Sequence, residues 1–309
     1  MEFEHVAALG AGVIGASWTA LFLASGRSVA VYDPSPEAPD TVRRYIDTTW
    51  PTLTKLGLTE NGKPDAVSFH QTAGDAVEGA AFIQESVPER LEIKHALFAD
   101  IESRMAEGAI IASSASGLTL GQMQPGFADP SRLVLGHPFN PPHLVPLVEV
   151  MGNAATAPGV ADAAARFYEA VGKVTIRVNR EVPGHVANRL QAAVWREAIH
   201  LVKSGVASVG DVDKAMAAGP GLRWAVMGPT TLFSLGAGPG GMQAFCDHFR
   251  DTFNGWWDDL GKPYLDDETI AMIVKGAEEA TQGASHAELS AQRDAMITAL
   301  QKALRPLRD

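Results

Sequence analysis

A histidine and a glutamate stand on either side of a proline turn, and together they have the chemistry to deprotonate an alcohol. His137 closes one apolar run, and Glu149 lies in the next. If the chain doubles back at Pro141-Pro142, a hairpin centred near residue 143 places these two residues opposite each other. A neutral imidazole takes up a proton near pH 7, and a carboxylate on its other ring nitrogen stabilises the imidazolium. The alternatives are a structural histidine and a glutamate that pairs with Lys or Arg.

A metal centre is disfavoured in the same segment. His137 and His143 are separated by prolines, and neither belongs to an H-E-x-x-H pattern. Cys246 is the only cysteine, so it supplies neither a thiolate cluster nor an intrachain disulfide. This cysteine usage is typical of a reducing cytoplasm. We therefore predict no metal and a cytoplasmic location.

The N-terminal segment carries a glycine pattern that is typical of dinucleotide binding. Gly10-Ala11-Gly12-Val13-Ile14-Gly15 matches G-x-G-x-x-G, follows a strand candidate and opens a helix candidate. Gly10 permits a tight turn, Gly12 allows the backbone to approach a pyrophosphate, and Gly15 allows the helix and strand to pack closely. The phosphate would rest on the positive end of the helix. The alternative is a glycine-rich helix start with no ligand.

An acidic residue then follows the second strand candidate, where ribose recognition requires one. The carboxylate of Asp33 would accept hydrogen bonds from the adenosine ribose and would repel a 2′-phosphate. Pro34 and Ser35 supply no arginine for such a phosphate. NAD is therefore the predicted cofactor rather than NADP, and Val13 and Ile14 complete its predicted site.

The elements that must position these residues alternate along the first part of the chain. This rhythm of short strands and helices favours a parallel sheet covered by helices. The predicted strands are 5–9, 28–32, 67–69, 81–83, 109–112, 133–135, 147–150 and 174–178. The predicted helices between them are 13–25, 37–56, 91–106 and 160–171.

The remainder of the chain is predicted to be helical. Gly and Pro separate its helical patterns, which cover 185–203, 209–218, 241–260, 267–281 and 286–304. We place a domain boundary near residue 182. The predicted fold is thus an α/β, Rossmann-type NAD-binding domain over 1–182 and an all-helical domain over 183–309.

Composition and charge exclude several partners. The chain has 309 residues, and its 25 basic and 36 acidic residues give a net charge of −11. An acidic surface repels phosphate backbones, so we expect no nucleic-acid partner. No run of about 18 apolar residues predicts a membrane span, and the N-terminus lacks the basic region of a secretory signal.

In combination, the motifs resemble those of the 3-hydroxyacyl-CoA dehydrogenase superfamily over nearly the whole chain. The resemblance is closest to the branch that contains L-gulonate 3-dehydrogenase, lambda-crystallin and L-carnitine dehydrogenase. Besides the glycine motif, it is carried by four segments, which are Gln84–Leu91, Ser113–Leu118, Gly136–Pro141 and Pro183–Leu190.

The resemblance implies roles for individual residues. It implies that His137 is the catalytic base and Glu149 its partner. It further implies that Ser116 and Asn188 hydrogen-bond the reacting oxygen, a task for which neutral polar groups are suited. Read without the family, Ser116 is a loop hydroxyl and Asn188 a polar group at a helix start.

The same resemblance extends to the cofactor and to assembly. Glu89 and Lys94 match family positions that line the cofactor and substrate cleft. It also implies NAD as cofactor and a homodimer formed through the helical domain. The reaction it implies is oxidation of a 3-hydroxyl group, either of a small free acid or of a CoA thioester.

The chain departs from the acyl-CoA pattern in two segments, and the second of them favours the free acid. Ser114 and Ala115 stand where the family has Asn and Thr before the serine. The segment 219–229 departs from the acyl-CoA enzymes' loop and contains Arg223, whose planar fork suits a carboxylate. We predict that Arg223 binds the substrate carboxylate; the alternative is a structural ion pair across a dimer.

Two further alternatives concern the substrate and the class of protein. Trp195 and Trp224 have aromatic faces that attract a quaternary ammonium such as that of carnitine, although core or interface packing is the commoner role of tryptophan in a helical domain. The chain could also be a nucleotide-binding structural protein of the crystallin kind. A structural role would not require His137, Glu149, Ser116 and Asn188 to be positioned together.

Overall fold

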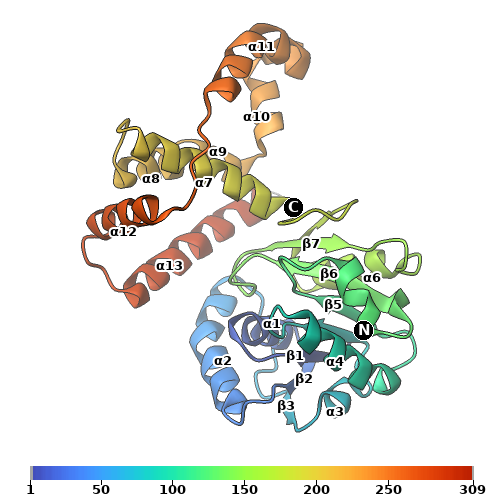
Figure 1. Cartoon of the computed structure of the whole chain (residues 1–309). Helices are drawn as coiled ribbons and strands as arrows, with labels where there is room; N and C mark the ends of the chain where they lie inside the picture. Colours follow the sequence, from blue (N-terminus) through green and yellow to red (C-terminus); the bar gives the residue numbers. More distant parts are fainter. Residues whose placement is uncertain (1–2, 308–309) are drawn as a thin grey trace. The chain divides into compact units, whose positions relative to one another are not determined.

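The computed structural model describes residues 3–307, which form two compact units. The first unit runs to Ala187 and includes the chain again from Gln292 onward, and the second comprises Asn188–Ala291. In Figure 1 the first unit is coloured mainly blue to green and the second yellow to orange.

The first unit is built on one eight-stranded sheet with the order β3-β2-β1-β4-β5-β6-β7-β8. All neighbouring strands pair in parallel except β6 and β7, which are antiparallel. The predicted mostly parallel α/β fold is confirmed. The strands are β1 (His5–Leu9), β2 (Ser28–Tyr32), β3 (Val67–His70), β4 (Phe82–Glu85), β5 (Ile110–Ser113), β6 (Leu133–Pro138), β7 (Leu147–Met151) and β8 (Val174–Arg177).

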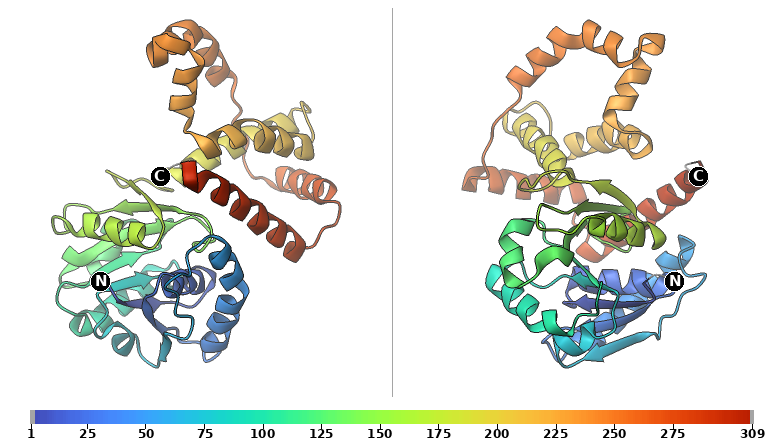
Figure 2. Two further views of the ribbon diagram at one scale, coloured as in Figure 1. Left: turned by 180° about the vertical axis from the view of Figure 1, so that it is seen from behind. Right: turned by 90° about the vertical axis from the view of Figure 1, so that its right-hand side faces the viewer.

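Helices cover both faces of this sheet, as the views in Figure 2 show. Side chains alternate across a strand, so Val6 and Ala8 of β1 enter one hydrophobic core while Ala7 and Leu9 enter the other. The first core receives side chains of α1, α2 and α6, and the second those of α3, α4 and α5. These helices are α1 (Val13–Ala24), α2 (Ala38–Lys55), α3 (Ala73–Val77), α4 (Leu91–Ile101), α5 (Leu120–Met123) and α6 (Val160–Ala170).

A buried lysine, Lys173, holds the connection between β6 and β7 through its hydrogen bonds. Lys173 donates hydrogen bonds to the carbonyls of Pro142 and Val145, and its ammonium lies 5.1 Å from the Trp18 ring centroid. Burial lowers the pKa of Lys173 to about 7, because a charged group loses hydration in the interior. The lysine thus fixes the loop between the strands of His137 and Glu149.

The C-terminal end of the chain belongs to the sheet-containing unit. Gln301 donates to the carbonyl of Leu144 at 2.6 Å, and Arg305 donates to that of Leu56 at 2.8 Å. The structure therefore differs from the predicted division at residue 182, which assigned everything after it to the helical domain. The reason is that α13 (His286–Leu304) begins in the second unit, while its residues from Gln292 onward belong to the first unit, where Gln301 and the following Arg305 hydrogen-bond loop carbonyls.

The second unit is helical, with two elements that the sequence did not suggest. Its helices are α7 (Ala187–Lys203), α8 (Val209–Ala218), α9 (Pro220–Val226), α10 (Pro229–Gly236), α11 (Gly241–Asp259) and α12 (Asp267–Thr281), and α13 begins in it. No helix was predicted in the segment 219–229, but it contains α9. Both α9 and α10 begin with proline, whose fixed φ suits the first turn of a helix.

Among residues 3–307, no helix is both long enough and apolar enough to cross a membrane.

Candidate active site

The hairpin that joins β6 and β7 pairs His137 directly with Glu149. His137 Nδ1 lies 2.8 Å from Glu149 Oε2, and both side chains are buried, at 6% and 0% exposure. The register predicted from the proline turn is therefore confirmed. Because the carboxylate can only accept, Nδ1 carries the proton and Nε2 keeps the lone pair that a general base requires.

Glu149 also joins the site to the start of α7. Its Oε1 accepts hydrogen bonds from the backbone N–H groups of Val186 and Ala187, each at 2.9 Å. Burial alone would raise the pKa of Glu149, but the hydrogen bonds from His137 and from these two amides outweigh it and lower the pKa below 4.5. The carboxylate is thus ionised at neutral pH and stabilises a positive charge on His137.

The loop after β5 places Ser116 against Glu89. The Ser116 hydroxyl donates to Glu89 Oε2 at 3.3 Å, and the backbone N–H groups of Ser116, Gly117 and Leu118 donate to the same carboxylate. Burial acts to raise the pKa of Glu89, but these amides and the charge of Lys94 lower it overall. Glu89 therefore holds the loop that carries Ser116.

Lys94, which the family resemblance implied to line the cofactor cleft, is buried beside Glu85. Its side chain is 1% exposed, and its ammonium lies 2.6 Å from Glu85 Oε1 and 3.4 Å from the carbonyl of Val87. Glu85 also accepts from the Ser113 hydroxyl. The lysine is therefore held within the first unit by an ion pair, and it fastens the β4–α4 loop. Its role toward the cofactor remains a prediction.

The three glycines of the β1–α1 turn differ in their surroundings, as dinucleotide binding requires: one adopts a tight turn, one leaves space for a phosphate, and one lies against the backbone. Gly10 has φ +95°, and a Cβ there would lie 2.6 Å from the Ser86 carbonyl oxygen. A Cβ on Gly15 would lie 1.8 Å from the Gly10 oxygen. A Cβ on Gly12 would meet nothing within 4 Å, so the protein itself does not need this glycine. The space beside Gly12 lies at the start of α1, where free N–H groups favour a phosphate.

The neighbouring residues complete this end of the site. Val13 is 62% exposed although α1 is otherwise mostly buried, and Ile14 is half-buried against the core. Asp33 follows β2, and its carboxylate accepts from the Ala11 N–H at 2.7 Å and the Ser35 N–H at 2.9 Å. The acidic group is thereby held directly beside the glycine turn, as ribose recognition requires. These residues fit a bound NAD.

Substituting Gly12 and Gly15 separates cofactor binding from folding. We expect Gly12→Ala to leave the melting temperature within about 2 °C of wild type, since its methyl group meets no protein atom. The same change should raise the Kd for NAD about tenfold, because the methyl group occupies the approach of the pyrophosphate. Gly15→Ala should instead lower the melting temperature. Calorimetric titration and thermal unfolding check both; equal NAD binding by Gly12→Ala and wild type would contradict the assignment.

Asn188 and Arg223 belong to the second unit. Asn188 is half-buried and directly follows Ala187, whose N–H is bonded to Glu149. Arg223 is exposed on α9, and its guanidinium makes no ion pair within residues 3–307. Their roles toward the substrate remain predictions.

The second histidine of the proline segment is not available as a ligand. His143 is 5% exposed, and its Nδ1 lies 2.9 Å from the Ser17 hydroxyl and 3.2 Å from the Tyr45 hydroxyl. Burial lowers its pKa to about 4, so the ring is neutral. His143 instead holds the β6–β7 loop against α1 and α2.

A histidine that was not among the predicted site residues lies beside the pair of His137 and Glu149. His185 was taken as the first residue of a helix, but α7 begins at Ala187 and His185 has φ +47°. Its ring centroid lies 5.1 Å from that of His137. In the sequence, His185 could have been noticed because it follows Pro183-Gly184 within the motif Pro183–Leu190.

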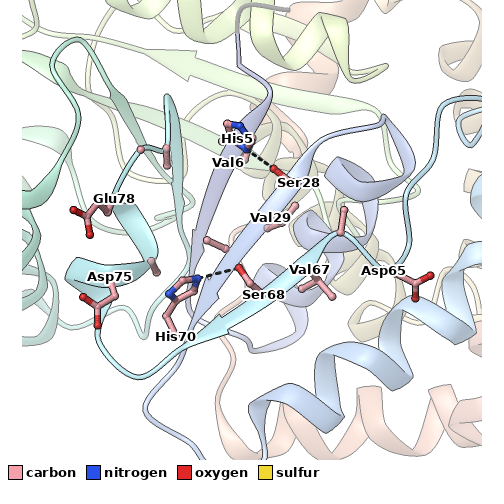
Figure 3. Close-up of a pocket in the computed structure, with 15 residues that line it drawn as sticks. His5, Val6, Ser28, Val29, Asp65, Val67, Ser68, His70, Asp75 and Glu78 are labelled. Carbon is pink, nitrogen blue, oxygen red and sulfur yellow. Dashed lines mark hydrogen bonds between the residues drawn. The ribbon is translucent and has the colours of Figure 1, made fainter.

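A cavity elsewhere in the first unit does not have this chemistry. It has a volume of about 580 Å³ and lies along β1–β3 and the segment of α3. Figure 3 shows His5 directed to Ser28 and His70 directed to Ser68. Asp75 at its rim is paired with Arg104 at 2.9 Å. None of the predicted site residues lines this cavity.

Comparison with known proteins agrees with the geometry. The family model for the 3-hydroxyacyl-CoA dehydrogenase NAD binding domain matches residues 5–182, and that for the C-terminal domain matches residues 184–268. An L-carnitine dehydrogenase of Streptomyces coelicolor is 50% identical over 94% of this chain and 92% of its own length. An L-carnitine dehydrogenase of Pseudomonas putida is 41% identical over 98% of this chain and 95% of its own.

A solved structure is similar over the whole chain. It is the crystal structure of 5-formyl-3-hydroxy-2-methylpyridine 4-carboxylic acid 5-dehydrogenase, described as an NAD+ dependent dismutase. The TM-score is 0.85 at 28% sequence identity, covering 98% of this chain and 99% of that one.

Proposed function

Because the chain belongs to the 3-hydroxyacyl-CoA dehydrogenase family, we propose that this NAD-dependent oxidoreductase of 3-hydroxy acids acts on a small free acid of the L-carnitine type. The main support for oxidation of a hydroxyl group is the buried, hydrogen-bonded pair of His137 and Glu149. The identity of 50% to an L-carnitine dehydrogenase supports the substrate class.

In the proposed mechanism, His137 is the general base. Its Nε2 takes the proton of the 3-hydroxyl group, and Glu149 stabilises the imidazolium that results. Ser116 and Asn188 hydrogen-bond the reacting oxygen. To donate to the ketone, the Ser116 hydroxyl turns away from Glu89, which keeps the amide N–H groups of the same loop as donors. When bound, the nicotinamide of NAD supplies the hydride acceptor. Gly10–Gly15 and Asp33 would hold the rest of the dinucleotide.

Glu89 and Lys94 support this site in different ways. Glu89 fastens the amides around Ser116, so it sets the position of the serine hydroxyl. Lys94 and Glu85 form a buried ion pair beneath the loop that faces Gly10. We propose that Lys94 serves NAD binding by positioning that loop.

Arg223 is the proposed partner of the substrate carboxylate. Its guanidinium is exposed and makes no ion pair among the described residues. We expect Arg223→Lys to raise KM for the free acid about tenfold with little change in kcat, because lysine keeps the charge but loses the bidentate fork. Initial rates with the free acid and the CoA thioester check this. Arg250→Lys on α11 is the matched control, and an unchanged KM and preference in Arg223→Lys would discard the role.

Two tryptophans of the second unit are proposed to face the cationic end of such a substrate. Trp195 on α7 is 49% exposed and Trp224 on α9 is 37% exposed, so neither is a core side chain of this unit. A quaternary ammonium gains about 0.5–2 kcal/mol over an aromatic face. Trp224 directly follows Arg223 in α9, so the two side chains project from the same helical turn in different directions.

The test of the proposed function is a substrate panel. Purified protein is mixed with NAD and with L-carnitine, L-gulonate, 3-hydroxybutyrate and 3-hydroxybutyryl-CoA, and NADH absorbance is followed. We expect the highest kcat/KM with L-carnitine. A higher value with the thioester would favour the acyl-CoA alternative, and NAD binding without turnover of any compound would favour a crystallin-like structural role.

A homodimer is proposed through the helical part of the chain. Trp256 and Trp257 on α11 are 57% and 64% exposed, next to Phe253, and such exposed aromatic clusters mark interfaces. We expect Trp257→Glu to shift the sedimentation coefficient from that of a dimer to that of a monomer, because the interface would then bury a charge. Lys214→Glu on α8 is the control, and identical sedimentation of Trp257→Glu and wild type would contradict this interface.

A further inference from the structure

His185 lies in a turn that is fastened to the catalytic pair. Its N–H donates to the Val182 carbonyl at 3.1 Å, and the next two N–H groups along the chain, of Val186 and Ala187, are bonded to Glu149. The side chain is 2% exposed. The backbone has φ +47°, a left-handed conformation that residues with a side chain rarely adopt. The chain therefore accepts an unfavourable backbone in order to bring this ring into the site.

The ring of His185 packs against that of His137. The two centroids are 5.1 Å apart, and the ring planes are inclined by 53°. His185 Nε2 lies 3.4 Å from the carbonyl oxygen of Ala115, the residue before Ser116. The imidazole thus lies between the loop of the predicted substrate serine and the catalytic histidine.

The surroundings of His185 determine which of its nitrogens carries the proton. A carbonyl only accepts hydrogen bonds, so Nε2 is the donor to Ala115. Burial, followed by the charge of His137, lowers the pKa of His185 below 6.5, while Glu149 and Glu89 act in the opposite direction. The ring is therefore neutral at pH 7, and Nδ1 presents a lone pair.

That lone pair has no donor within the described part of the chain. His185 Nδ1 is buried, and no group of residues 3–307 hydrogen-bonds it. A buried acceptor without a partner is unfavourable, and an apolar ring of the same shape would avoid the loss. An imidazole at this place is accounted for by a donor that arrives with a bound molecule.

We propose that His185 is a cofactor-positioning residue whose Nδ1 accepts a hydrogen bond from the carboxamide N–H of the nicotinamide. The nicotinamide must lie beside His137, because proton and hydride leave neighbouring atoms of one substrate. The His185 ring lies in contact range of His137. The proton of the 3-hydroxyl group is given to His137 and is not available to His185. The inference rests on the proposed function only for the identity of His137 as the base.

The experiment compares two nucleotides that differ in the nicotinamide. His185→Phe keeps the ring shape and removes both nitrogens, and ADP-ribose is NAD without its nicotinamide. We expect His185→Phe to raise the Kd for NAD about fivefold to thirtyfold, the loss of one buried hydrogen bond, and to leave the Kd for ADP-ribose within twofold. Calorimetric titration measures both, and thermal unfolding establishes that the variant is folded.

Two further arms identify the contact. The 3-acetylpyridine analogue of NAD lacks the carboxamide N–H. Wild type should therefore bind this analogue more weakly than NAD, whereas His185→Phe should bind the two nucleotides with equal Kd. The comparison is a double-mutant cycle between the residue and the cofactor group. His185→Asn retains an acceptor at the position of Nδ1 and tolerates a left-handed backbone. Its Kd for NAD should therefore lie within about threefold of wild type, while Kd for ADP-ribose stays unchanged.

Other results would overturn the proposal. If NAD and ADP-ribose keep the same affinity ratio in His185→Phe as in wild type, Nδ1 does not contact the nicotinamide. If only KM for the acid changes, the donor belongs to the substrate. These titrations need no turnover, so a failure of the substrate panel and a failure of this inference are distinguishable.

Discussion

His137→Ala is expected to lower kcat by about a thousandfold, within the range that a general base contributes. Without the imidazole, only water remains to take the proton of the 3-hydroxyl group. The Kd for NAD should stay within about twofold of wild type, because the residues that fit the dinucleotide are those around Gly12 and Asp33. Steady-state rates and calorimetric titration of NAD measure the two effects separately.

A comparison within the same loop serves as the control for this variant. His143→Gln removes the other histidine of the segment, which contacts Ser17 and Tyr45; it should lower thermal stability and change kcat far less than His137→Ala does. Retention of kcat within threefold in His137→Ala would remove this residue from the mechanism.

Glu149→Gln is expected to lower kcat by about a hundredfold or more without unfolding the protein. The amide oxygen still accepts from the N–H groups of Val186 and Ala187, so the amide NH₂ faces His137 Nδ1. His137 must then accept at Nδ1 and carry its proton on Nε2, the wrong tautomer for a base. Turnover rates measure the loss, and circular dichroism measures retention of the fold.

The same variant has a distinct pH dependence of stability. Because the pKa of Glu149 is lowered in the folded state, the unfolded state binds its proton more readily. The stability that the carboxylate contributes is thus present above pH 4.5 and is lost as the pH falls below it. The difference in melting temperature between wild type and Glu149→Gln should therefore shrink from pH 6 to pH 4. A difference that stays constant over this range, or a kcat near that of wild type, would contradict the network around Glu149.

Much of the first unit could be predicted because its signals are local. The strand bounds 5–9 and 28–32 match β1 and β2, since a short apolar or β-branched run and the Gly or Asp that follows it are read within a few residues. The pairing of His137 with Glu149 followed from the position of one turn, because an antiparallel register is determined once its centre is known.

Predictions that depended on distant partners were less complete. Lys94 of α4 resembled a ligand-lining residue in its motif, and the structure shows its ammonium paired with the Glu85 carboxylate at the end of β4. The helical pattern of α13 does not indicate which surface the helix covers. Gln301 near its end donates to the carbonyl of Leu144, and Arg305, just after the helix, donates to that of Leu56. His185 is an ordinary turn residue in the sequence, and only the folded chain brings its ring to His137.

The sequence by itself determined the alternation of strands and helices, the glycine turn with its acidic residue, and the opposition of His137 and Glu149. Each of these follows from periodicity or from a turn within a short stretch of chain. Only the tertiary structure decided which buried polar groups have a hydrogen-bonding partner, as Lys94 has in Glu85, and which have none among the described residues, as Nδ1 of His185. That outcome depends on contacts between segments more than a hundred residues apart, such as Ser17 with His143. The spacing of residues along the chain does not indicate such contacts.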